Sequence, residues 1–305
     1  EGEGDEEARF GNGLYRSDDG GVTWEKKNDI NSRPFYYSQV RVDPADPDRV
    51  YWSSTPVQFS PDGGETVGQT TLGIHVDHHA MWIDPNDPDR IVVGNDGGVA
   101  ITWDQGGNWN YLNNMALGQF YHVSYNMDVP YRVCGGLQDN GTWCGPSRVE
   151  NGDVSKYHWA TISGGDGFFT AQDPVDSHVV FAESQGGNMA RIDMRTGERT
   201  AVEKPDWRTK WRPLQDTIVT LQKEGAGEDN PRIRELQARA SADSAALQLR
   251  WNWNTPFLIS PHDRMVFYAG ANRVLKSTDR GETLEPVSPD LTYADTMKIR
   301  VSTET

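Results

Sequence analysis

The stretch Ser17-Asp18-Asp19-Gly20-Gly21-Val22-Thr23-Trp24 decides the fold that this sequence predicts. Its pattern, Ser-x-Asp-x-Gly-x-Thr-Trp, returns over 102–109 and, in weaker form, over 60–67 and 277–284. The first three copies begin 43 and 42 residues apart, a pitch that is typical of repeat architectures. Gly supplies a backbone conformation that other residues resist, while Asp and Ser or Thr side chains bond the turn's own amides. We therefore expect one stapled hairpin turn per repeat, built on the structural residues Ser17, Asp19, Gly21, Trp24, Asp62, Asp104, Trp109 and Asp279.

A second periodic signal is an Asp-Pro turn that ends an apolar run. It occurs at Asp43, Asp84 and Asp173, with weaker equivalents at Asp128 and Ser260. A short β-branched and aromatic run follows the Asp-Pro turns, as expected of a strand. Each unit thus holds four short antiparallel strands in about 40–45 residues, which is typical of a β-propeller blade. The sequence predicts an all-β propeller of about five and a half to seven such blades.

The expected organisation is a single propeller domain over 1–305, read as a fragment of a longer chain. Residues 206–250 form a helical insertion between blades, because 214–249 lack strand character and Asn230-Pro231 is a helix start. The acidic segment Glu1–Glu7 is expected to be disordered or newly exposed. A partial blade comes first, and five more are expected near 33–70, 76–115, 119–149, 157–205 and 251–290.

These repeats resemble the Asp-box, or BNR-repeat, β-propeller superfamily, which includes sialidases, xyloglucan-active glycosidases, the sorting receptor sortilin and a photosynthetic assembly factor. The stretches 94–98, 136–143 and 251–256 are similar in particular to the sortilin-like propellers of large secreted bacterial proteins labelled glycosyl hydrolases. The resemblance covers most of the chain. It implies the fold and says little about activity, because the repeated box is a structural turn.

Charge and cysteine content restrict the partner and the compartment. A net charge of −16 argues against binding to nucleic acid. The sequence has no run of 18 apolar residues, so we expect no transmembrane segment, and contact with a membrane complex would need a partner. Cys134 and Cys144 flank a Gly-containing turn, which favours a cross-strand disulfide and a periplasmic or secreted location. The alternative is two small buried apolar side chains.

Polar and aromatic residues recur at two register positions of the repeat. Both positions are expected on the propeller face where ligands usually bind, and they suit a polysaccharide or a protein partner. The alternative is that the Asp-Gly and Asn-Gly pairs are simply good hairpin turns. The candidate ligand-binding residues are Tyr36, Tyr121, Asp139, Asn140, Gln185, Trp253 and Asn272.

Three aspartates are candidate catalytic residues. Asp77 and Asp166 occupy the same repeat position two blades apart, and Asp96 lies in a predicted turn. Two carboxylates across a cleft act as general acid and base in glycoside hydrolysis. The arginine triad and the Tyr–acid pair of sialidases are not recognisable in the sequence.

A metal site is a further alternative in the histidine-rich stretch 75–79. In an extended strand, His75, Asp77 and His79 share one face and offer ligands of the right type. Such a strand spaces alternate side chains about 6.6 Å apart, so chelation requires a bend. The sequence predicts no other cofactor. The preferred hypothesis is a binding or scaffold module outside the cytoplasm, and one form of it is an accessory subunit of a larger complex. The alternative is a glycoside hydrolase.

Overall fold

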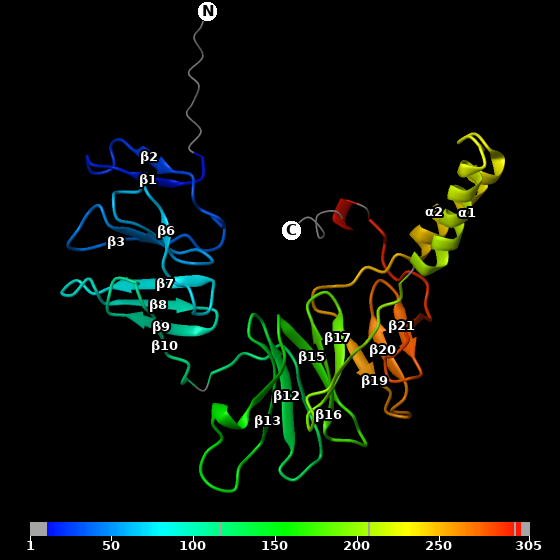
Figure 1. Cartoon of the computed structure of the whole chain (residues 1–305). Coiled ribbons are helices and arrows are strands. Elements are labelled where there is room, and N and C mark those ends of the chain that lie inside the picture. Colours follow the sequence, from blue (N-terminus) through cyan, green and yellow to red (C-terminus); the bar gives the residue numbers. More distant parts are fainter. Residues whose placement is uncertain (1–10, 116, 207, 296, 300–305) are drawn as a thin grey trace, which may run out of the picture. The chain divides into compact units, whose positions relative to one another are not determined.

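The computed structural model describes residues 11–115, 117–206, 208–295 and 297–299, so the acidic segment Glu1–Glu7 lies outside the described residues. The chain is built from consecutive small antiparallel sheets, and a pair of helices is inserted before the last sheet (Figure 1). It divides into two compact units, Glu1–Leu117 (unit 1) and Gly118–Thr305 (unit 2). The single domain predicted over 1–305 stays a prediction.

The described part of unit 1 contains one two-stranded sheet and two four-stranded sheets, in each of which the strands follow one another in sequence order. The strands are β1 (Leu14–Arg16), β2 (Glu25–Asn28), β3 (Val40–Val42), β4 (Val50–Trp52), β5 (Gln58–Ser60), β6 (Gly68–Gln69), β7 (His78–Ile83), β8 (Ile91–Asn95), β9 (Gly98–Thr102) and β10 (Asn110–Tyr111).

The described part of unit 2 contains three four-stranded sheets of the same kind. A short 3-10 helix precedes β14, and helices α1 and α2 lie between β18 and β19. The elements are β11 (Val123–Tyr125), β12 (Arg132–Leu137), β13 (Gly141–Pro146), η1 (Lys156–His158), β14 (Ala160–Ser163), β15 (Gly167–Gln172), β16 (Val179–Ser184), β17 (Asn188–Asp193), β18 (Arg199–Ala201), α1 (Arg208–Lys223), α2 (Pro231–Leu247), β19 (Phe257–Ile259), β20 (Phe267–Gly270), β21 (Val274–Ser277) and β22 (Glu285–Pro286).

This architecture confirms the predicted all-β fold of four-stranded propeller blades with a helical insertion. The Asn230 side chain accepts the Arg232 N–H at 2.9 Å and so caps α2, as the Asn-Pro pair predicts. Ile218 of α1 packs against Ile233 and Leu236 of α2, so the two helices share a small core of their own.

The predicted stapled turns each connect the third and fourth strands of a sheet or, at the first turn, β1 and β2. In every copy the aspartate accepts the N–H of the residue four positions later, at 2.8 to 2.9 Å. Hydrogen bonds from side chains and backbone lower the pKa of Asp19, Asp104 and Asp279 to about 2. Three of these turns also contact the preceding sheet. At Gly106 a Cβ would lie 2.0 Å from Thr70 Oγ1, and the backbone has φ +93°, so only glycine fits.

The tryptophans that end two of the stapled turns differ in burial, because a preceding sheet covers only Trp109. Trp109 packs against the core of unit 1 and donates its indole N–H to the Thr70 carbonyl at 2.8 Å. Trp24 is 55% exposed and bonds only within its own turn, to the Gly21 carbonyl. Trp24 therefore lies at the surface, whereas Trp109 is half-buried.

This difference predicts unequal costs of truncation. Trp109→Ala removes a packed indole and a hydrogen bond and should lower the free energy of unfolding by about 2 kcal/mol. Trp24→Ala should change it by less than about 0.5 kcal/mol, as for other exposed positions. Urea denaturation of the two variants checks the contrast, and equal losses would contradict it.

The cysteine prediction is confirmed by the sheet register. Cys134 of β12 lies directly opposite Cys144 of β13, and the two sulfurs form a disulfide. Both residues are buried beside Val180 of the next sheet.

One predicted blade boundary is wrong. Residues 157–163 were assigned to the fourth full-length blade, but β14 (Ala160–Ser163) pairs with β13 and completes the sheet before it. No stapled turn precedes β14. The chain instead reaches it through a long loop and η1, so the repeat pattern gave no signal there.

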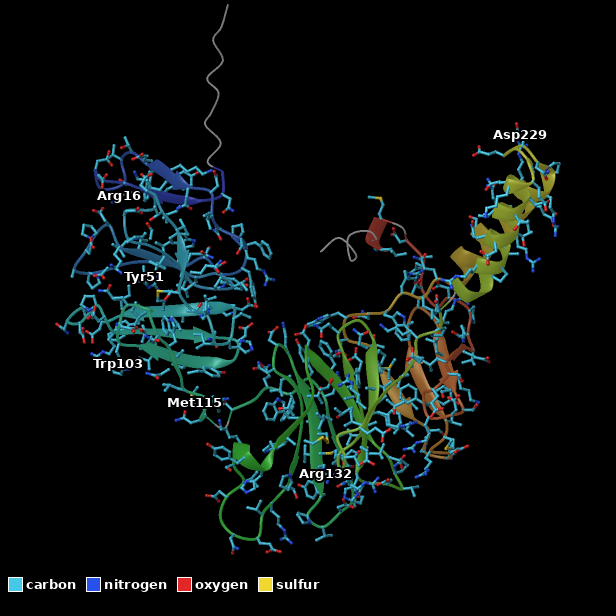
Figure 2. The ribbon with its side chains drawn as sticks, in the orientation of Figure 1. Arg16, Tyr51, Trp103, Met115, Arg132 and Asp229 are labelled. Carbon is cyan, nitrogen blue, oxygen red and sulfur yellow. A yellow bond between two sulfur atoms is a disulfide. The ribbon has the colours of Figure 1, made fainter. Side chains whose placement is uncertain are left out.

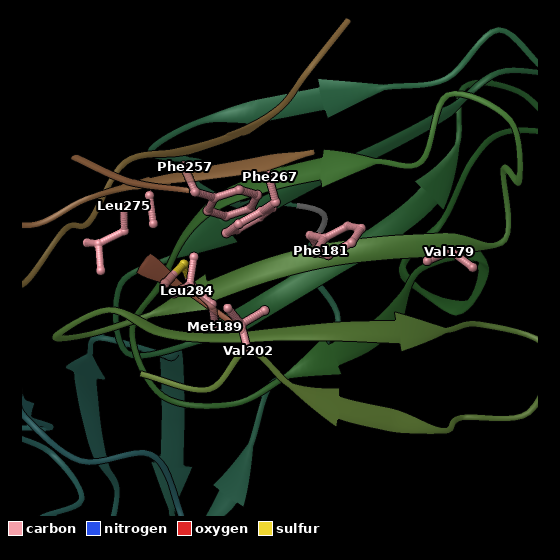
Figure 3. Close-up of a cluster of buried hydrophobic side chains, with 9 residues drawn as sticks. Val179, Phe181, Met189, Val202, Phe257, Phe267, Leu275 and Leu284 are labelled. Atoms are coloured by element: carbon pink, nitrogen blue, oxygen red, sulfur yellow. The ribbon is translucent and has the colours of Figure 1, made fainter. Parts of the chain in front are cut away.

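The cores lie between successive sheets. In unit 1, Tyr51 is 1% exposed and packs with side chains of β7, β8 and β9 (Figure 2). In unit 2, Phe181, Phe257 and Phe267 pack together between the β15–β18 and β19–β22 sheets (Figure 3). The second strands β4 and β16 are buried along almost their whole length.

Candidate functional site

Each unit gathers polar and aromatic side chains at one end of its sheets. In an antiparallel sheet the start of the first strand and the turn between the second and third strands lie at the same end. The two register positions of the sequence analysis fall at these places. We name the two groups the Asp77 cluster, in unit 1, and the Trp253 cluster, in unit 2.

The Asp77 cluster consists of Arg33, Tyr36, Tyr37, Asp77, His79 and Asp96. Asp77 precedes β7 and has φ +62°, a conformation uncommon for a residue with a side chain. Tyr37 donates its hydroxyl proton to Asp77 Oδ1 at 2.5 Å, and Arg33 Nη1 lies 3.8 Å from Asp77 Oδ2. Tyr37 is buried, and this burial together with the Asp77 carboxylate raises the pKa of its phenol.

The second half of this cluster is a histidine–aspartate contact beside two tyrosine rings. His79 Nε2 lies 2.8 Å from Asp96 Oδ1. The His79 ring meets the rings of Tyr36 and Tyr37 edge to face, each at 5.1 Å between centroids. An oxygen of Asp96 lies within 4.8 Å of one of Asp77, so the cluster holds two adjacent carboxylates.

The geometry does not favour the metal set His75, Asp77 and His79. The strand begins only at His78. The positive φ of Asp77 interrupts the extended backbone that would place the three side chains on one face. The His75 ring lies against Gly97, whereas His79 pairs with Asp96. Within the described residues these three side chains do not bring their ligand atoms together as one group. His78 between them is fully buried, which lowers its pKa to about 4.

The Trp253 cluster consists of Tyr121, Gln138, Asp139, Asp166, Phe168, Gln185 and Trp253. Asp166 is its centre, just before β15. Its Oδ2 accepts the indole N–H of Trp253 at 2.9 Å, and its Oδ1 accepts the backbone N–H of Asp139 at 2.9 Å. Its own N–H donates to Gln185 Oε1 at 2.7 Å. One residue therefore joins three successive sheets of unit 2.

Aromatic rings complete this cluster. Trp253 meets Phe168 and Tyr121 edge to face, at 4.6 and 6.0 Å between centroids. The Tyr121 hydroxyl donates to Gln138 Oε1 in the β12–β13 turn. Close contact of the sheets is possible because Gly136 has no side chain, since a Cβ there would lie 2.1 Å from the Gly167 backbone.

The remaining predicted residues lie apart from this cluster or within a local turn. Asn140 donates its amide to the Gln138 carbonyl and accepts the Trp143 indole N–H through its own carbonyl. Asn272 is 4% exposed and bonds Arg250 and Asp290 through its side chain, which is a structural role. Asp77 and Asp166 belong to different units, so neither unit contains the predicted catalytic pair.

Several residues of the two clusters were missed by the register argument: Arg33, Tyr37, Gln138 and Phe168. The register argument also missed Glu183 of β16, which is fully buried and bonds the backbone of two loops that carry the Trp253 cluster. Burial raises the pKa of Glu183 to about 7. An acidic residue at the end of the apolar run Val179-Val180-Phe181-Ala182 was the signal that could have found it.

Within the residues that the structure describes, none of the helices has the length and hydropathy needed to cross a bilayer.

Comparison with known proteins gives a likeness to solved structures only. No protein family model and no curated protein matches the chain. The GH74 xyloglucanase from Xanthomonas campestris is 14% identical over 90% of this chain and 42% of its own, with a TM-score of 0.32. The structure of YCF48 bound to D1 peptide is 15% identical over 91% of this chain and 76% of its own, at 0.30. YCF48 from Cyanidioschyzon merolae is 11% identical over 83% of this chain and 86% of its own, with a TM-score of 0.32. The chain thus spans less than half of the xyloglucanase, and at these TM-scores the likeness carries no functional inference.

Proposed function

We propose that the chain is a binding module that recognises a protein segment or a glycan through the Trp253 cluster. The observation that carries this proposal is the hydrogen bonding of the Asp166 carboxylate. Both of its carboxylate oxygens already accept N–H groups of the protein, so it organises the surface rather than exchanging protons with a substrate. Trp253 and Tyr121 remain 44% and 40% exposed, as ligand-contacting aromatics need to be.

The chemistry of the cluster suits a polar ligand with some apolar surface. Exposed aromatic rings stack on sugar rings or on peptide side chains, while amides and a carboxylate fix orientation through hydrogen bonds. The side chains are held by contacts among themselves, so little order has to be gained when a ligand binds. We further propose a periplasmic or secreted location, supported by the Cys134–Cys144 disulfide, and a role as an accessory subunit of a larger complex.

The proposal is tested with two variants of the cluster. Trp253→Ala and Asp166→Asn should each weaken binding of the ligand found by glycan-array and peptide-library screening by at least about tenfold, as loss of an interface aromatic does. Trp103→Ala is the matched control, because Trp103 is a half-exposed tryptophan in unit 1. Wild-type protein that retains nothing from either screen, or variants that bind as the wild type does, would contradict the proposal.

A glycoside hydrolase is the second candidate, and the Asp77 cluster favours it. Asp77 and Asp96 carry carboxylate oxygens within 4.8 Å of each other, close to the separation of about 5–5.5 Å in retaining enzymes. Phe35 and Tyr36 beside them are 81% and 55% exposed, which offers a platform for a sugar ring. Under this hypothesis the pair is Asp77 with Asp96, rather than Asp77 with Asp166.

Turnover of β-glucans and sialosides separates the two candidates. If the chain hydrolyses either, Asp77→Asn and Asp96→Asn should lower the rate by about 10²–10⁴-fold. Asp87→Asn, an exposed aspartate of unit 1, should leave it unchanged. The absence of turnover by the wild type removes this candidate and leaves the binding proposal to stand on its own screens.

A further inference from the structure

A buried glutamate lies directly behind the Trp253 cluster. Glu183 is the fifth residue of β16, and its exposed fraction is 0%. The residues before it in the strand are apolar and equally buried. A carboxylate in such surroundings is costly unless hydrogen bonds satisfy it, so its contacts indicate what it does.

Glu183 connects two loops that the sequence separates by about 70 residues. Its Oε1 accepts the N–H of Gly187, in the β16–β17 turn, at 3.3 Å. The same atom accepts the N–H of Thr255, just before β19, at 3.1 Å. Its Oε2 is buried and has no hydrogen-bond partner among the described residues. One oxygen therefore holds both loops, and the Phe169 N–H of β15 is a further backbone donor that lowers the pKa of this carboxyl.

Both loops carry residues of the Trp253 cluster. The β16–β17 turn holds Gln185, and the Gly186 N–H donates to the Trp253 carbonyl at 2.9 Å. In the second loop the Thr255 hydroxyl donates to the Asn252 carbonyl at 2.7 Å. The path from Glu183 to the Trp253 indole thus runs through two short loops. The indole in turn reaches Asp166.

We propose that Glu183 is the positioning residue of the Trp253 cluster, and that its ionised carboxylate clamps the 185–187 and 252–255 loops in the binding arrangement. A carboxylate accepts N–H groups more strongly than a neutral acid does. Protonation of Glu183 therefore weakens the clamp and loosens the contact between the Trp253 indole and Asp166. The consequence for ligand binding rests on the proposed function, whereas the coupling of Glu183 to Trp253 does not.

Burial of Glu183, opposed by one nearby cation, determines the pH at which it is protonated. Burial raises the pKa of Glu183 to about 7, and Lys204 is the charged side chain that opposes the shift. Lys204 Nζ donates to the Gly186 carbonyl at 2.8 Å, and its own pKa is lowered by burial. On the other side, His122 stacks on Phe169 of β15, the strand paired with β16. Asp166 is the charged group that bonds the Trp253 indole.

The test follows the indole N–H resonance of Trp253 by NMR in the full chain, assigned with Trp253→Phe. In the wild type this resonance should move with a midpoint near pH 7. In Glu183→Gln the movement should vanish. Glu198→Gln is the matched control, an exposed glutamate of the same sheet, and should keep the wild-type titration. His122→Gln should also keep it.

A second measurement uses the wild type alone, so it remains valid if Glu183→Gln does not fold. In the wild type, the side-chain carboxyl carbon of Glu183 should titrate with the same midpoint as the Trp253 indole. An indole resonance that stays fixed between pH 5.5 and 8.5, or follows His122 instead of Glu183, overturns the proposal. No ligand is used, so failure of the proposed binding function leaves this result independent.

Discussion

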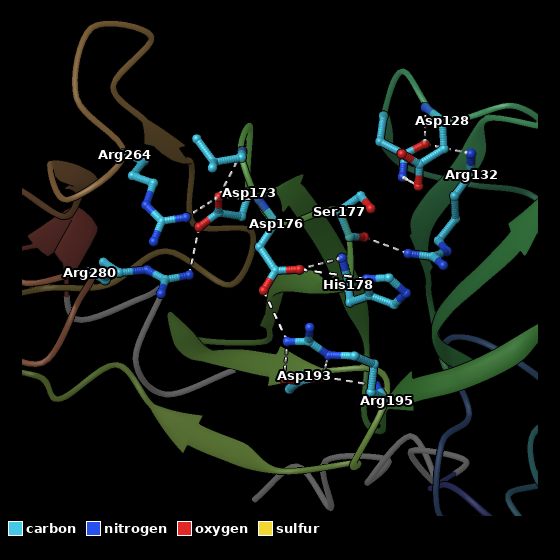
Figure 4. A network of polar contacts seen from close by, with 12 residues as sticks. Asp128, Arg132, Asp173, Asp176, Ser177, His178, Asp193, Arg195, Arg264 and Arg280 are labelled. Atoms are coloured by element: carbon cyan, nitrogen blue, oxygen red, sulfur yellow. Dashed lines mark hydrogen bonds and ion pairs between the residues drawn. The ribbon is translucent and has the colours of Figure 1, made fainter.

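Replacing Asp173 with Ala should lower the free energy of unfolding by about 3–5 kcal/mol, as loss of one partner of a buried ion pair does. The Asp173 side chain follows β15 and is 0% exposed. Its Oδ2 lies 2.6 Å from Arg280 Nη2 and its Oδ1 lies 3.4 Å from Arg264 Nη1 (Figure 4). Both arginines come from the β19–β22 sheet, so the carboxylate ties one blade to the next.

The same carboxylate also holds its own turn. Oδ1 accepts the N–H groups of Val175 and Asp176 at 2.9 and 3.0 Å. Asp173→Asn keeps one acceptor for these N–H groups and removes the charge. We therefore expect it to lower the free energy of unfolding, but by less than Asp173→Ala does. The two substitutions together separate the turn contribution from the ion-pair contribution.

Urea unfolding measures both losses, and a second ion pair supplies the control. Asp229 and Arg234 are paired on the surface, with 92% and 64% of their side chains exposed. Asp229→Ala should cost less than about 0.5 kcal/mol, because exposed pairs contribute little. An Asp173→Ala variant no less stable than Asp229→Ala would contradict the role of Asp173 as a link between blades.

The repeat pattern predicts the sheets well because the information is local. A stapled turn needs one aspartate, one hydroxyl or amide and one glycine within eight residues, and the hydrogen bonds of Asp62 and Asp104 confirm that reading. Where no such turn occurs, as before β14, the boundary between blades was misplaced. Burial is less local. Trp24 and Trp109 have the same sequence context, and only the presence of a covering sheet distinguishes them.

In the candidate site, too, the sequence predicts the local positions but not the packing between sheets. Register alone selected Asp166, Gln185 and Trp253, because the ends of antiparallel strands follow from the repeat. These three residues do meet, Gln185 at the backbone N–H of Asp166 and Trp253 at its carboxylate. Register did not find Glu183 or Tyr37. Which face of a strand or loop turns inward depends on packing between sheets, and that is not contained in the period of one repeat.

The pH dependence of stability gives the second large expected effect. Burial raises the pKa of Glu183 to about 7 from its ordinary value of 4.5. Between these two pH values the folded chain binds a proton that the unfolded chain has released. The cost of burying the charge is therefore fully present above pH 7, and it disappears as the pH falls toward 4.5. A shift of this size corresponds to about 3 kcal/mol.

We therefore expect the wild type to gain up to about 3 kcal/mol of unfolding free energy, relative to Glu183→Gln, when the pH falls from 8.5 to 5. The comparison with Glu183→Gln removes most of the general effect of the net charge of −16, because the formal charge of the variant differs by only one. The range stays above the acid region, where Asp19, Asp104 and Asp279, with pKa values near 2, lose stabilising hydrogen bonds. Urea unfolding at five pH values measures the difference. Parallel curves for the two proteins would mean that Glu183 is ionised in the folded chain throughout this range, and its clamp would then not respond to pH.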